Sequence, residues 1–249
     1  MEKFEPQQFR NELAKKIKKL PKEGRKEILE KSKASPEYWQ ARGEKIHERQ
    51  KEEEIDDGLG ILVKKKMLYH GSGTSGIKNF NRAEEDTVGS GIYFTSQAKD
   101  AIGYARRRAR REKNAVPVIY EVSIENIKLL DLRKDENVKK ILDGFKQILI
   151  EKLKDTNLKW NFKTVLQRAI ESINSGRVGS GNLREVTFST GQMFSDYLKS
   201  LGYEGLITFE GGEGKDVGIH DTYLIFDPEK AKIIQEHKIY KRIGHQRKS

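Results

Sequence analysis

The sequence contains no cysteine, and this absence excludes several kinds of site at once. Disulfide bonds, thiolate catalysis and zinc sites with cysteine ligands all need a residue that is missing. No apolar run approaches the roughly eighteen residues of a transmembrane helix. The opening residues, Met1-Glu2-Lys3-Phe4-Glu5, lack the apolar core of a secretory signal. We therefore expect a soluble, cytoplasmic protein that needs no membrane and no metal.

Apolar residues are also scarce, because 35% of the 249 residues are hydrophobic and another 35% are charged. This leaves little core for the length, so part of the chain should form an extended helical segment. The formal net charge is +11. Such a charge is compatible with an ordinary basic protein whose lysines are solvated, or with a polyanionic partner, most simply nucleic acid.

Residues 1–57 have few β-strand signals and a helical pattern, with Phe9, Leu13 and Ile17 recurring at helical spacing. Pro21 ends the first helix, and Ser35-Pro36 starts the third, which carries a dense run of charge to Asp57. We predict a helical N-terminal extension over 1–57. It either packs on the main domain, 58–249, or binds a partner protein.

The main domain alternates strand and helix signals, which predicts an α+β fold. Predicted strands cover 61–69, 92–95, 116–124, 127–132, 205–210 and 222–226. A predicted helix covers 97 to about 114, capped by Thr95-Ser96. From about 135 to 202 the apolar residues keep helical spacing, so this part is predicted to be a helical insert. Glycine and charged residues fill 211–218, which predicts a polar loop.

The stretch from Leu68 to Tyr104 carries the residues that suggest binding chemistry. His70 is followed by Gly71, whose exposed backbone can hold a carboxamide through one donor and one acceptor. Tyr93 and Tyr104 can enclose a flat cationic ring, and the histidine can bond a ribose hydroxyl. A lone histidine beside glycine is often only structural, so the two tyrosines carry the prediction. Together these groups describe a site for the nicotinamide half of NAD.

The motifs in this stretch resemble the ADP-ribosyltransferase fold of the diphtheria-toxin and poly-ADP-ribose-polymerase branch, including toxin-type transferases of bacteria and phages. The matching residues are Leu68-Tyr69-His70-Gly71-Ser72, Gly91-Ile92-Tyr93-Phe94 and Tyr104, which follows Tyr93 by eleven positions. The later segments 202–207 and 223–228 resemble the closing half of that fold. The resemblance covers about 66–130 and 195–236. It implies a split, mostly antiparallel β-sheet core and NAD as the co-substrate.

The resemblance also implies roles for individual residues. His70 would bind the nicotinamide ribose and Gly71 the carboxamide, while Tyr93 and Tyr104 would stack the ring. Ser72 would lie against the adenine-side ribose. Gly91 completes the predicted NAD site beside Tyr93, and Arg82 either reaches the pyrophosphate or is a surface arginine.

Two positions depart from the family pattern. Ala101 stands where a serine often helps to hold the carboxamide, and Thr222 stands where the family has its catalytic glutamate. A carboxylate is needed there to stabilise positive charge as nicotinamide leaves. We assign that role to Asp221, with Thr222 orienting the acceptor. Glu213 and Asp216 in the polar loop are further candidates.

An arginine run follows Tyr104 directly and is either a solvated helix face or a surface that tracks phosphates. Its members are Arg106, Arg107, Arg108, Arg110 and Arg111, followed by Lys113 and, in the tail, by Lys238, Lys241, Arg242, Arg247 and Lys248. We expect a mono-ADP-ribosyltransferase that acts as an intracellular toxin or phage-defence effector. Its acceptor would be RNA or a protein, with RNA favoured, and an antitoxin or regulatory protein is a possible partner.

Two alternatives stay open. The missing glutamate is compatible with a degenerate NAD-fold module that only binds nucleic acid or a partner protein. An RNA 2′-phosphotransferase on the same fold is disfavoured, because Tyr93 occupies the place where that chemistry would need a histidine.

Overall fold

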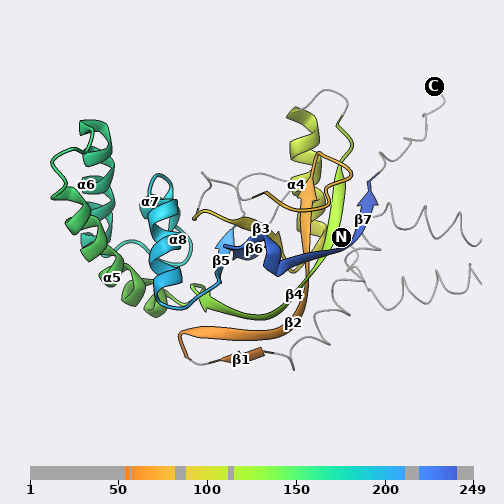
Figure 1. The fold of residues 1–249 in the computed structure, drawn as a ribbon, viewed down its shortest axis with the longest axis horizontal. Helices are drawn as coiled ribbons and strands as arrows, with labels where there is room; N and C mark the ends of the chain where they lie inside the picture. Colours follow the sequence, from red (N-terminus) through yellow and green to blue (C-terminus); the bar gives the residue numbers. More distant parts are fainter. Residues whose placement is uncertain (1–53, 57, 82–87, 112–114, 211–218, 240–249) are drawn as a thin grey trace, which may run out of the picture.

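The computed structural model describes residues 54–56, 58–81, 88–111, 115–210 and 219–239. Within them the chain forms a mixed α+β fold, as the sequence predicts (Figure 1). The predicted N-terminal helices fall in 1–53, outside the described residues. The sequence prediction was wrong at the end of that extension. Glu54–Asp56 is strand β1, antiparallel to β2, and not the last turn of a helix.

The longest strands are β2 (Gly60–Ser72) and β4 (Val118–Asp131), which form one antiparallel pair. Their register runs from Gly60 opposite Leu130 to Ser72 opposite Val118. The sequence analysis predicted two strands where β4 is one. The polar residues Glu125 and Asn126 interrupt the apolar pattern, but the pairing with β2 continues on both sides of them. This pair is the frame on which the other strands are placed.

Three short strands complete the sheet: β3 (Ile92–Thr95), β5 (Gly205–Glu210) and β6 (His220–Ile225). Strand β6 lies between β3 and β5 and is antiparallel to both. Strand β5 runs parallel to the end of β4, whereas β3 meets β2 at Tyr69 opposite Thr95. The five strands β2, β3, β6, β5 and β4 therefore close into a ring, in which β2 and β3 are paired only at Tyr69 and Thr95 among the described residues.

A further strand, β7 (Ala231–Lys238), lies antiparallel to the first half of β4. It follows a short 3₁₀ turn, Pro228–Lys230, in which the N–H of Glu229 donates to Oδ1 of Asp227 at 3.0 Å. The sequence analysis predicted only a basic tail from His237. Strand β7 is an edge strand, and its charged and amide residues hide the alternation that marks a buried strand.

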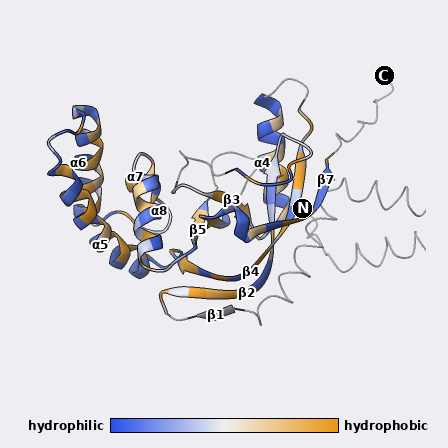
Figure 2. Ribbon diagram, viewed as in Figure 1, coloured by the Kyte–Doolittle hydropathy of each residue, from blue (hydrophilic) through white to orange (hydrophobic). Residues whose placement is uncertain are grey.

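The interior of the strand ring is apolar, with buried residues contributed by every strand of the ring. Figure 2 shows stretches of hydrophobic colour along β2 and β4, whereas α4 is coloured mostly hydrophilic or intermediate. A second apolar cluster joins the helical insert to the end of the sheet, through residues such as Phe145, Phe194 and Leu206. The insert is therefore packed on the sheet by its own core.

The helices occupy two ends of the molecule (Figure 1). Helix α4 (Ala98–Arg111) crosses β2, while α5 (Asp135–Leu153), α6 (Trp160–Asn174), α7 (Arg184–Thr187) and α8 (Gly191–Ser200) form the insert. The N–H of Gln97 donates to the Thr95 hydroxyl at 3.1 Å, close to the predicted cap of α4. No helix among the described residues is long and apolar enough to span a membrane.

Candidate active site

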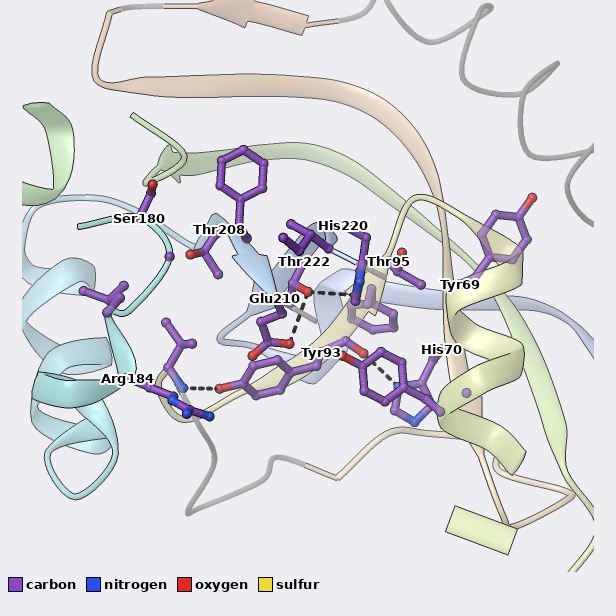
Figure 3. A pocket seen from close by; sticks show the side chains of 18 of the residues that line it. Tyr69, His70, Tyr93, Thr95, Ser180, Arg184, Thr208, Glu210, His220 and Thr222 are labelled. Carbon is purple, nitrogen blue, oxygen red and sulfur yellow. Dashed lines mark hydrogen bonds between the residues drawn. The ribbon is translucent and has the colours of Figure 1, made fainter. Parts of the chain in front are cut away.

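A cavity of about 420 Å³ opens between the strand ring, helix α4 and the insert. Figure 3 shows its side chains converging from strands that are distant in sequence. Among the residues proposed from the sequence, the cavity brings together His70, Gly71, Tyr93, Tyr104, Arg107, Arg108 and Thr222. The predicted nicotinamide-binding residues thus share one site.

The imidazole of His70 is held in one orientation by the protein backbone. Its Nδ1–H donates to the carbonyl oxygen of Tyr93 at 2.8 Å, which leaves Nε2 as an acceptor. The pKa of His70 is lowered, mainly because the ring is buried. The hydrogen bond to Tyr93 acts in the opposite direction, and the positive charge of Arg108 lowers the pKa further. His70 is therefore neutral near pH 7 and can accept a hydrogen bond from a sugar hydroxyl.

The Tyr93 ring is fixed at its hydroxyl end. The hydroxyl accepts from the N–H of Val88 at 2.9 Å and of Gly89 at 3.1 Å, and it donates to the carbonyl oxygen of Gly89 at 2.9 Å. Three bonds to two neighbouring residues leave the ring little freedom. Tyr93 is therefore a rigid wall of the cavity before any ligand arrives.

Tyr104 forms another wall from helix α4. Its ring contacts the edge of His220, with centroids 5.7 Å apart, and the guanidinium of Arg107 lies 5.8 Å from its centroid. An arginine over an aromatic face is attracted by the electrons of the ring. The contact places a positive charge at the cavity wall beside the ring that was predicted to stack nicotinamide.

The floor of the cavity is one face of the β5–β6 hairpin. Thr208 lies opposite Thr222 and Glu210 opposite His220, so side-chain alternation puts all four on the same face. The Thr222 hydroxyl donates to Oε2 of Glu210 at 3.2 Å and lies 3.3 Å from Nε2 of His220. Glu210 thus supplies a carboxylate directly beside Thr222.

The sequence analysis missed both Glu210 and His220 as site residues. It considered carboxylates in β6 and in the loop before it, whereas Glu210 comes from the neighbouring strand β5. A signal was present in β5, where the polar residues Thr208 and Glu210 alternate with Phe209 at the end of an apolar strand. To recognise Glu210 as a site residue, one must also know which residues of β5 and β6 lie opposite each other.

The family model for the ADP-ribosyltransferase in polyvalent proteins matches residues 64–239. The chain belongs to this ADP-ribosyltransferase family. The matched range includes every element that lines the cavity. No protein with a curated description matches the sequence.

Among solved structures, the M. tuberculosis MbcT–MbcA toxin–antitoxin complex resembles this transferase with a TM-score of 0.40 and 11% sequence identity. The likeness covers 72% of this chain and 86% of that chain. A similarity of this size carries no inference about the activity or partners of the present transferase.

Asp221, the carboxylate assigned from the sequence, is not part of the transferase cavity. The assignment is corrected because alternation turns Asp221 away from the face that carries Thr222. Its Oδ2 accepts from Nη1 of Arg133 at 2.7 Å, and Arg133 also binds Asp131 through Nε and Nη2, at 2.8 and 2.9 Å. Asp221 therefore ties β6 to the end of β4, a structural role.

Burial of Asp131 opposes its ionisation, but the hydrogen bonds and charge of Arg133 outweigh burial and hold the pKa of Asp131 below its usual value. The two carboxylates raise the pKa of the Arg133 guanidinium further above its already high range. Asp131 and Arg133 are therefore both ionised at neutral pH.

Two residues assigned to NAD binding also need correction. Ser72 is buried, does not line the cavity, and accepts the N–H of Thr74 at 3.0 Å, which shapes the turn after β2. Gly91 does not line it either, and a Cβ at this position would overlap the carbonyl oxygen of Ile225, so there is no room for a side chain. Arg82, Glu213 and Asp216 lie outside the described residues.

Gly71 does line the cavity, as predicted. The structure gives a packing reason for a glycine at this position, in addition to the predicted contact with a carboxamide. A Cβ at this position would overlap the carbonyl oxygen of Ala101 on helix α4. The glycine lets β2 and α4 meet backbone to backbone, which brings His70 and Tyr104 to the same cavity.

The arginine run of α4 divides between two environments. Arg107 and Arg108 line the cavity, whereas Arg106, Arg110 and Arg111 do not. Lys238 ends strand β7, and the remaining basic tail and Lys113 lie outside the described residues. The nucleic-acid role of this run stays a prediction.

Residues 180–185 of the insert form a wall of the cavity, and Ser180 and Arg184 lie across the cavity from His70 (Figure 3).

Among the described residues, no group of three or more acidic or histidine side chains is arranged to hold a metal ion. The described part of the cavity offers sugar- and phosphate-binding groups, the aromatic rings of Tyr93 and Tyr104, and the Glu210 carboxylate beside the Thr222 hydroxyl.

Proposed function

We propose that this family member is an NAD-dependent mono-ADP-ribosyltransferase that modifies a macromolecule. One observation supports this most strongly. The Glu210 carboxylate bonds Thr222 in the same cavity that His70, Tyr93 and Tyr104 line. Thr222 occupies the family's glutamate position, so Glu210 restores negative charge from the adjacent strand.

The cavity residues fit the nicotinamide half of NAD. Nε2 of His70 can accept a ribose hydroxyl, and the fixed ring of Tyr93 can pack against the pyridinium ring opposite Tyr104. Arg107 and Arg108 are at the cavity wall near these groups and suit the charge of a pyrophosphate. They take the role that sequence analysis considered for Arg82.

The proposed reaction breaks the bond between the ribose anomeric carbon and the nicotinamide nitrogen, and the bonding electrons leave with neutral nicotinamide. The acceptor then forms a bond to the anomeric carbon and loses a proton. Positive charge grows on the ribose as the bond breaks, and Glu210 is placed to stabilise it. The walls made by Tyr93 and Tyr104 exclude water and hold the reacting groups in place.

The acceptor that we favour is RNA, with a protein side chain as the alternative. The net charge of +11 and the arginines of α4 favour a polyanion. We propose a role as a toxin or phage-defence effector, held in check by an antitoxin or regulatory protein. Growth arrest on expression, lost in a Glu210→Gln variant, is the expected result.

The proposed chemistry is tested by nicotinamide release and transfer of labelled ADP-ribose in cell extract. His70→Ala, Tyr93→Ala and Glu210→Gln should each abolish most transfer, while Asp221→Asn serves as the comparison on the other face of the hairpin. Label that survives protease but not ribonuclease identifies RNA; the reverse identifies protein. An intact NAD-binding protein with no nicotinamide release and no label would support the degenerate module instead.

A further inference from the structure

The hydroxyl of Thr222 lies between two side chains and has only one proton to donate. Its Oγ1 is 3.2 Å from Oε2 of Glu210 and 3.3 Å from Nε2 of His220, and Figure 3 shows Thr222 between the two. An ionised carboxylate accepts hydrogen bonds but cannot donate one, so the Thr222 proton points to Glu210. His220 can then bond Thr222 only if its Nε2 carries a proton and is the donor.

The other histidine of the cavity has the opposite arrangement of protons. Nδ1 of His70 donates to the carbonyl oxygen of Tyr93 at 2.8 Å, so Nε2 of His70 is left as an acceptor for a ligand. In His220, by contrast, Nε2 faces a hydroxyl whose proton is directed to Glu210. One cavity therefore contains an accepting and a donating imidazole.

Helix α4 contributes two residues that act on the His220 ring. Tyr104 contacts it edge to face, with ring centroids 5.7 Å apart and planes at 69°. Asp100 precedes Tyr104 by about one helical turn, so both lie on the same side of α4. Asp100 is buried, and its Oδ2 has no hydrogen-bond partner among the described residues. Burial raises the pKa of Asp100, and the charges of His220 and Lys99 oppose that rise, so the carboxyl is within electrostatic reach of the ring.

We propose that His220 is a positioning residue of the transferase, whose Nε2–H donates to Oγ1 of Thr222. This bond turns the Thr222 proton toward Glu210 and fixes the carboxylate for the transition state. Tyr104 and the buried Asp100 keep the His220 ring in place. The assignment rests on the proposed transferase function, because that function requires an ionised Glu210. It makes His220 act through Thr222 and not by contact with the ribose.

Substitutions of His220 test which ring nitrogen is needed. The amide of glutamine places a donor near the position of Nε2, whereas the shorter asparagine reaches only the position of Nδ1. The single-turnover rate of nicotinamide release at saturating NAD should stay within about twofold in His220→Gln and fall about fivefold in His220→Asn. The KM for NAD should change little in both, because the bond acts on the transition state. Equal losses of rate in the two variants overturn the assignment.

The matched control is His237→Gln, which makes the same replacement on β7, outside the residues that line the cavity. Its rate of nicotinamide release per folded molecule should equal that of the parent.

A double-variant cycle tests whether His220 acts through Thr222. Thr222→Val alone should lower nicotinamide release about fivefold, and adding His220→Asn should cause little further loss. Independent actions would instead multiply to a loss of about 25-fold. A multiplied loss would show that His220 works without Thr222 and would overturn the proposal.

Nitrogen NMR of ¹⁵N-histidine-labelled protein tests the proton assignment without any reaction. The signals of His220 and His70 are identified by their disappearance in His220→Gln and His70→Gln. At neutral pH, Nε2 of His220 should have the chemical shift of a protonated nitrogen and Nε2 of His70 that of an unprotonated one. An unprotonated Nε2 in His220 overturns the proposal, whether or not the protein cleaves NAD. A protonated Nε2 in a folded protein that never releases nicotinamide would keep the hydrogen-bond assignment and reject the proposed chemistry.

Discussion

The two faces of the β5–β6 hairpin each carry a carboxylate, and their surroundings give them different roles. Glu210 lies on the cavity face beside Thr222, while Asp221, next to Thr222 in sequence, lies on the other face against Arg133. Neighbours in a strand point to opposite sides, whereas residues facing each other across a hairpin share a side. The comparison teaches that the register of the hairpin, and not proximity in sequence to Thr222, decides which carboxylate faces the cavity.

The largest loss of activity should come from a substitution on the cavity face of the β5–β6 hairpin. Glu210→Gln keeps the size of the side chain but removes the negative charge that we propose stabilises the positively charged ribose as nicotinamide departs. Nicotinamide release should fall by about 10²–10³-fold, the range seen when one transition-state electrostatic contact is removed. Single-turnover kinetics with saturating NAD measure it. A loss smaller than that of Asp221→Asn would reverse the assignment of the two faces.

On the opposite face, Asp221→Asn should lower stability and leave the catalytic rate of the folded protein within a few fold. The substitution weakens one of the bonds to Arg133 in a cluster that is only partly exposed. We expect a loss of about 1–2 kcal/mol in the free energy of unfolding. Urea denaturation provides the measurement, and nicotinamide release per folded molecule is the control that distinguishes instability from lost catalysis.

The hydroxyl between Glu210 and His220 should have a smaller effect. Thr222→Val removes the 3.2 Å bond that orients Glu210 and preserves the shape of the side chain. The expected loss in nicotinamide release is about fivefold, corresponding to about 1 kcal/mol for one neutral-donor hydrogen bond. Thr222→Ser should retain most activity, and equal losses in the two variants would argue for packing instead of orientation.

The smallest expected effect is a change in how the stability of the fold depends on acidic pH. Because the folded pKa of Asp131 is depressed, its ionised form contributes stability above the ordinary pKa of aspartate, about 3.9, and this contribution is lost as the pH falls toward the folded value. Thermal melts of the parent and Asp131→Asn should differ most at neutral pH and converge below about pH 4. A constant difference across this range would mean that ionisation of Asp131 does not stabilise the fold.

Local signals in the sequence predict much of this fold. Strands β3 and β5 have the predicted bounds because glycine turns mark their starts, and the periodic residues of α5 locate the insert. The residues of the predicted binding motif could also be recognised, because His70 and Tyr93 lie beside glycines on two strands that both line the cavity. The order of these motifs, with Tyr104 eleven positions after Tyr93, led to the prediction of one shared site.

Other features depend on pairing that the sequence does not display. Strands β1 and β7 carry mostly charged or amide residues, so only their hydrogen-bonded partners reveal them as strands. Glu210 becomes a site residue only when Thr208 is placed opposite Thr222. Ser180 and Arg184 reach the cavity through the packing of the insert, which no local pattern encodes.

The backbone contact at Gly71 limits how the width of this cavity can be changed by substitution. Because β2 and α4 touch through main-chain atoms, the distance between the strand with His70 and the helix with Tyr104 is set by the thickness of the polypeptide itself. Shortening side chains along that seam cannot bring the two elements closer, and adding one carbon at position 71 must push them apart. Attempts to accept a wider or narrower dinucleotide should therefore begin at the insert wall, where the spacing is set by side chains.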